Sequence, residues 1–133
     1  MTVIVWVATL VVAAVHLLAF LWEVVLIQRP SVHEGVFAIP ARDLPAIRLW
    51  AFGVGFYNLF LAAGAVAGVL FWAAGEETVG KTLVVYVCVF AALSGLVLFV
   101  GDRMALSRER GSGVGGAVAQ GVPPLVALGA MLL

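Results

Sequence analysis

The sequence predicts an all-α fold, a four-helix bundle that spans a membrane and whose helices are joined by short loops. Of its 133 residues, 65% are hydrophobic and only 11% are charged, whereas roughly a quarter of the residues are charged in a soluble domain. The apolar residues fall into four runs, each close to the ~20 residues that a helix needs to cross the hydrocarbon core. Helices are expected because lipid offers no hydrogen-bond partner to unpaired backbone groups.

Charged or Gly/Pro-rich segments separate the four predicted helices, which form a single domain. The first helix is expected to end at "QRP", because Pro30 disfavours helix at the preceding residue. Asp43 is placed to cap the second helix, and Pro45 is tolerated in its first turn. "EETVGK" opens the third helix and "GDR" closes it, and the polar "ALSRERGSG" precedes the fourth. The expected helices span about residues 2–27, 44–74, 79–101 and 114–133 of the domain 1–133.

Basic residues predict the orientation of the bundle. The two connections on one side contain six arginines, whereas the opposite side offers only Lys81 and the amino terminus. By the positive-inside rule, residues 28–43 and 102–113 are expected in the cytoplasm and both termini on the outer side. Five of the six arginines, Arg29, Arg42, Arg103, Arg108 and Arg110, lie within these ranges, and Arg48 lies in the first turns of the helix that follows the first range.

Two ionisable residues, His16 and Glu23, interrupt the first apolar run. They are two helical turns apart, so both are expected on one helix face, about 10 Å apart along the axis. An ionised carboxylate at the bilayer centre costs roughly 2.5 to 3.5 kcal/mol, so such a group is expected to face the bundle or a wet cavity. Glu23 also argues against a cleaved signal peptide, which would carry small residues at its end.

The other helices supply polar side chains at similar depths. Asn58 is expected near the level of His16, Arg48 is expected near the level of Glu23, and Gln120 precedes "GVPP" in the fourth helix. We therefore expect a polar cluster in the cytoplasmic half of the bundle, in which His16, Asn58 and Gln120 face one interior space. Glu23 has two interpretations: a fixed counter-ion of Arg48, or a carboxyl group that titrates.

Two motifs, "GFYNLFLAAG" and "QGVPPLVAL", together with an intramembrane histidine and a glutamate seven residues on, carry a resemblance over nearly the whole chain. The sequence resembles the domain-of-unknown-function family 1304, small four-helix membrane proteins of bacteria and fungi. This resemblance implies a fold and no established activity, and we expect a bacterial plasma membrane. Gly53 and Val54 stand where the family is expected to carry Asn-Gln, so a site that those amides complete would be reduced here. The residues that match signature positions are His16, Glu23, Tyr57, Asn58, Gln120 and Pro123.

Several kinds of site are not expected. His16, His33 and Cys88 lie on different segments, and the chain has no i,i+4 ligand pair, so neither a metal site nor a cofactor is predicted. "GSGVGG" fits a nucleotide-binding pattern but lacks the preceding strand, so a hinge is expected instead. A net charge of zero gives no sign of nucleic-acid binding. Gly64 and Gly68 permit close helix packing, either within the bundle or in a homo-oligomer.

Three functional classes remain open. The favoured one is a protein whose polar pocket binds or transports a small amphipathic or lipid-soluble molecule, such as a membrane lipid. The second is an accessory or structural subunit whose polar residues only join helices, through hydrogen bonds worth about 0.6 kcal/mol each. The third is a membrane enzyme that uses Glu23 and His16 as an acid–base pair on a lipid-soluble substrate.

Overall fold

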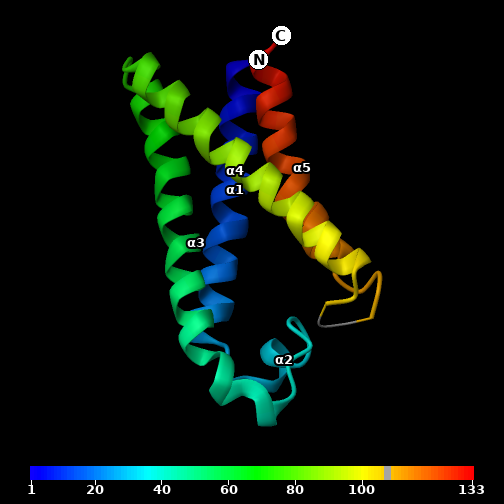
Figure 1. The fold of residues 1–133 in the computed structure, drawn as a ribbon. Coiled ribbons are helices and arrows are strands. Elements are labelled where there is room, and N and C mark those ends of the chain that lie inside the picture. Colours follow the sequence, from blue (N-terminus) through cyan, green and yellow to red (C-terminus); the bar gives the residue numbers. More distant parts are fainter. Residues whose placement is uncertain (107–108) are drawn as a thin grey trace.

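The computed structural model describes residues 1–106 and 109–133, and within them it contains helices joined by turns and loops, without strands (Figure 1). Four helices are long and apolar enough to span a membrane, which confirms the predicted fold class. They are α1 (Thr2–Phe20), which continues into the π-helical turn η1 (Leu21–Val25), then α3 (Leu44–Ala73), α4 (Glu77–Arg103) and α5 (Val114–Met131). Arg108, one of the six arginines used for orientation, lies outside the described residues.

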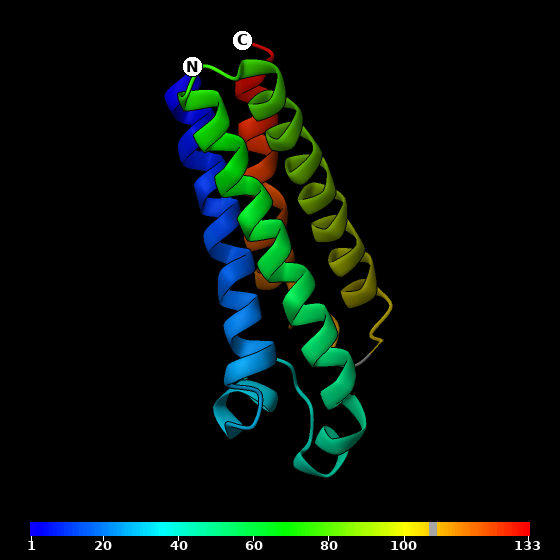
Figure 2. The same cartoon turned by 90° about the vertical axis from the view of Figure 1, so that its left-hand side faces the viewer.

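The four helices form a ring in which each packs against two neighbours, in the order α1, α3, α4, α5 and back to α1. Both termini lie at the same end of the bundle (Figures 1 and 2). At that end α4 lies beside α3, and towards the other end it slopes away from α3 and follows α5 (Figure 1). The two helix pairs α1–α3 and α4–α5 therefore diverge towards the end that carries the longest connection, residues 26–43.

Small residues allow the helices to approach closely. A Cβ atom at Gly95 of α4 would lie 2.7 Å from the Cα and N atoms of Gly121 in α5. Gly68 of α3 faces α4, since a Cβ atom there would lie 3.0 Å from Val84. Gly64 also faces α4, so this small-residue pair serves packing inside the bundle. Close packing of this kind holds membrane helices together, because lipid chains are as apolar as the core itself.

The connection between η1 and α3 is folded. It contains the short helix α2 (Pro30–His33) and the 3-10 turn η2 (Ala41–Asp43). His33 is buried, and its Nδ1 lies 2.8 Å from the carbonyl oxygen of Ile39, while the backbone N–H of Ile39 donates to the carbonyl oxygen of His33 at 2.6 Å. These two hydrogen bonds between His33 and Ile39 close the loop. Asp43 precedes α3 but does not cap it, because η2 continues directly into the helix and leaves Asp43 in helical backbone geometry.

A buried carboxylate fastens the connection between α4 and α5. Asp102 accepts hydrogen bonds from the backbone N–H groups of Gly111 at 2.8 Å and Gly113 at 2.7 Å, and from the guanidinium of Arg103. Gly113 is the residue immediately before α5, so Asp102 ties the end of one helix to the start of the next. The sequence "GDR" indicated only a helix end and gave no sign of this role.

Candidate functional site

The site begins with the π-helical turn at the end of α1. The N–H of Leu26 donates to the carbonyl oxygen of Leu21 at 2.9 Å, five residues back rather than four. Such turns hold more residues per turn than an α-helix and frequently occur at functional sites. Glu23 lies at the centre of this turn. The π geometry was not predicted, and it changes the direction in which Glu23 points.

Glu23 is held against α3 by Asn58, whose Nδ2 donates to Glu23 Oε2 at 2.9 Å. Gly55 makes this contact possible. A Cβ atom at Gly55 would overlap a methyl group of Val24 and lie 3.2 Å from the Cβ of Glu23. Because Gly55 has no side chain, η1 lies directly on α3, and Asn58, one turn along the same helix, reaches the carboxylate.

His16 makes a separate pair with Gln120. Its Nδ1 lies 2.8 Å from the carbonyl oxygen of Val12, and since a carbonyl only accepts, Nδ1 carries the proton. The other ring nitrogen is then free to accept from Gln120 Nε2 at 3.5 Å, a long hydrogen bond between α1 and α5. His16 is 2% exposed. Pro123 and Pro124 follow in α5, and they lack the N–H groups that would bond the carbonyls four residues earlier.

The expected single cluster is therefore divided into two pairs. His16 is buried and Asn58 and Gln120 are partly buried, but no hydrogen bond within the described part of the chain joins the His16–Gln120 pair to the Glu23–Asn58 pair. The prediction assumed 3.6 residues per turn from His16 to Glu23. The π turn rotates Glu23 away from the face that His16 shares with α5, and turns it towards α3. His16 and Glu23 thus have different hydrogen-bond partners.

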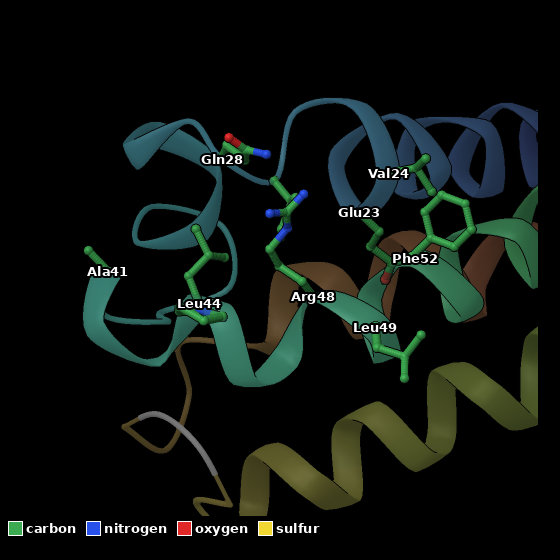
Figure 3. A pocket seen from close by; sticks show the side chains of 10 residues that line it. Glu23, Val24, Gln28, Ala41, Leu44, Arg48, Leu49 and Phe52 are labelled. Carbon is green, nitrogen blue, oxygen red and sulfur yellow. The ribbon is translucent and has the colours of Figure 1, made fainter.

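An open cavity of about 620 Å³ lies beside Glu23, between η1, the folded loop and the first turns of α3 (Figure 3). Glu23 and Arg48 both line it, but among the described residues no ion pair within 4 Å joins them. Of the two interpretations of Glu23, the counter-ion of Arg48 is not seen, since the long, exposed Arg48 side chain extends towards Gln28 (Figure 3). The lining residues are Glu23, Val24, Ile27, Gln28, Ala41, Leu44, Pro45, Arg48, Leu49 and Phe52.

Tyr57 lies apart from both pairs. It neighbours Asn58 in α3, but successive helical residues point in directions about 100° apart, and its side chain is 67% exposed. In the part of the chain that the structure describes, no three His, Cys, Asp or Glu side chains gather closely enough to hold a metal ion.

Sequence analysis missed Gly55, Gln28 and Phe52 as parts of the site. The signal for Gly55 was present: a glycine stands one helical turn before Asn58 in "GFYN", on the face that Asn58 presents to η1. Gln28 and Phe52 gave no comparable signal, since their place in the cavity depends on how the loop after η1 folds back onto α3.

Comparison with known proteins identifies a family that covers nearly the whole chain. A family model described as "Protein of unknown function (DUF1304)" matches residues 10–132. The chain belongs to this family. The DUF1304 match includes both polar pairs and confirms the resemblance inferred from the two motifs. No curated protein and no solved structure matches the chain.

The departure from the expected DUF1304 motif lies next to the site. A Cβ atom at Gly53 would meet nothing within 4 Å, and the Val54 side chain is exposed. Neither position lines the cavity, and the Glu23–Asn58 bond is formed without amides there.

Proposed function

We propose that the protein binds or transports a small amphipathic or lipid-soluble molecule in the cavity beside Glu23. The observation that supports this most is the character of the cavity: a carboxylate and a guanidinium that are not paired with each other, set among apolar side chains. Ligand sites are typically concave, about 300 to 1,000 Å³, and mostly apolar with a few polar groups. The cavity, at about 620 Å³, has this size and composition.

The chemistry of Glu23 supports a binding role over a purely architectural one. A structural hydrogen bond with Asn58 needs one acceptor oxygen, which a neutral glutamine would supply without the cost of placing an acid in a membrane helix. Only Oε2 of Glu23 is hydrogen-bonded within the described residues. The second oxygen is available to a ligand. The His16–Gln120 pair, in contrast, fits an architectural role, because its contact joins α1 to α5.

Blocking the cavity should abolish retention of the ligand. Ala41 lines the cavity at its loop end, whereas Ala46 is exposed on α3 and does not line it. Native mass spectrometry of gently extracted protein should find an amphipathic molecule retained by the parent and by Ala46→Trp, and about tenfold less of it, equivalent to 1.4 kcal/mol, in Ala41→Trp. Equal retention by the two tryptophan variants, with equal thermal stability, would contradict the proposal.

We also propose that both termini face the outside, on the strength of the arginine bias. In a Cys88→Ala background, Ser112→Cys should resist a membrane-impermeant maleimide in intact cells and react after permeabilisation. Thr78→Cys, at the opposite end of α4, should react in intact cells and serves as the control. The reverse pattern of labelling would invert the orientation.

A further inference from the structure

We infer that the ligand of this cavity is a zwitterionic amphipath that carries a primary ammonium and a phosphate, the headgroup chemistry of an aminophospholipid. The inference rests on the proposed function and names the class of ligand. It follows from three features of the cavity: its balance of charge, the free hydrogen-bonding capacity of its polar groups, and its position at the apolar surface of α3.

The charges of the cavity balance without forming a pair. The cavity has one acidic side chain, Glu23, and one basic side chain, Arg48, and Gln28 is neutral. A ligand with only an anionic group would bring that group into a site that contains Glu23, and a simple cation would share the site with Arg48. Placing like charges together is unfavourable, whereas a zwitterion offers each residue its opposite.

The free hydrogen-bonding capacity of Glu23 and Arg48 indicates which charged groups the ligand carries. Glu23 has one carboxylate oxygen available as an acceptor, and a primary ammonium has three N–H donors. A quaternary ammonium has none. Arg48 forms no hydrogen bond within the described residues, and its planar guanidinium matches the oxygens of a phosphate with two parallel bonds. Gln28, beside Arg48 in Figure 3, adds an amide to the same end of the cavity.

The position of the cavity fits a lipid. Leu49 and Phe52 line it and are also exposed on the outer surface of α3, so the cavity continues into a surface that hydrocarbon chains would cover. Ala41, from the connection between η1 and α3, marks the other end of the cavity. A lipid would therefore place its headgroup between Glu23 and Arg48 and leave its chains along α3.

Lipid selectivity tests the inference. The protein is reconstituted in nanodiscs of phosphatidylcholine that contain equal amounts of phosphatidylethanolamine and phosphatidylglycerol, and retained lipids are counted by native mass spectrometry. The parent should retain phosphatidylethanolamine about tenfold over each of the other two. Glu23→Gln should remove the preference over phosphatidylglycerol, and Arg48→Gln should reduce retention of all three. Glu34→Gln and Arg42→Gln alter exposed charges that do not line the cavity, and should behave like the parent.

The outcomes separate this inference from the proposed function. Equal retention of phosphatidylethanolamine and phosphatidylglycerol by the parent would overturn the ligand class, yet leave the proposed function standing if Ala41→Trp still loses lipid. Retention that Ala41→Trp does not change would overturn both. Displacement of the lipid by the water-soluble headgroup glycerophosphoethanolamine at equal concentration would show that the ligand is no lipid. Arg48→Gln changes an exposed side chain, so it keeps the test open if Glu23→Gln does not fold.

Discussion

Replacement of Gly55 by alanine is expected to lower the free energy of unfolding by about 1 to 3 kcal/mol, the usual cost of overpacking, and to abolish retention of the ligand. The added methyl group would overlap Val24 and crowd the Cβ of Glu23. Valine has a stiff side chain that does not rotate away easily. The π turn η1 would then have to separate from α3, which breaks the bond between Asn58 and Glu23 and reshapes the cavity.

Gly53→Ala is the matched control for this prediction. It is the same substitution two residues earlier in α3, and its methyl group would meet nothing within 4 Å. The melting temperature should stay unchanged or rise slightly, because alanine favours a helix over glycine by up to about 1 kcal/mol. Thermal melting and native mass spectrometry of both variants in the same detergent provide the measurement. If both variants behave like the parent, the close approach of η1 to α3 does not matter for the site.

Asp102→Asn is expected to be the most damaging single change outside the cavity, with a loss of about 1.5 to 3 kcal/mol of stability, the range for hydrogen bonds to charged groups. Both oxygens of Asp102 accept bonds from backbone N–H groups, and one also accepts from Arg103. An asparagine keeps one oxygen and turns its NH₂ group towards other donors. At least one of these donors then loses its acceptor at the junction of α4 and α5.

Asp43→Asn supplies the comparison for Asp102. Asp43 also lies next to an arginine at a helix end, directly before α3. Its contact with Arg42 is 3.7 Å long, however, and both side chains are exposed. Exposed ion pairs are worth about 0 to 1 kcal/mol, so the melting temperature should hardly change. Similar destabilisation by the two substitutions would show that burial of the Asp102 carboxylate does not set its contribution.

The fold could be predicted from the sequence because its signals are local. Four apolar runs separated by polar or proline-containing breaks determine four spans, and the observed helix ends, such as Ala73 and Arg103, differ from the expected ones by only one or two residues. Depth in the membrane also follows from position along a helix. His16, expected to face the bundle, is buried, and Asn58 and Gln120 are partly buried.

The pairing inside the site could not be predicted in the same way. Which side chain faces which neighbour depends on rotation about the helix axis, and the π turn at Leu21–Val25 alters that rotation without any periodic signal in the sequence. The contact at Gly55 depends on a helix that lies some thirty residues away in the chain. The direction of Arg48 depends on a folded loop whose closure relies on His33 and Ile39.

The shared location of the two termini, at the end of the bundle away from the cavity, allows a covalent pair to be built (Figure 1). A linker from the last residue of one copy to the first residue of a second copy need not cross the bilayer, so both copies insert in the same direction. Such a tandem chain presents two cavities on the same side of the membrane, and either copy can carry a cavity substitution while the other keeps the parent sequence. Comparing tandem chains with two, one or no intact cavities then shows how many cavities must be intact for activity.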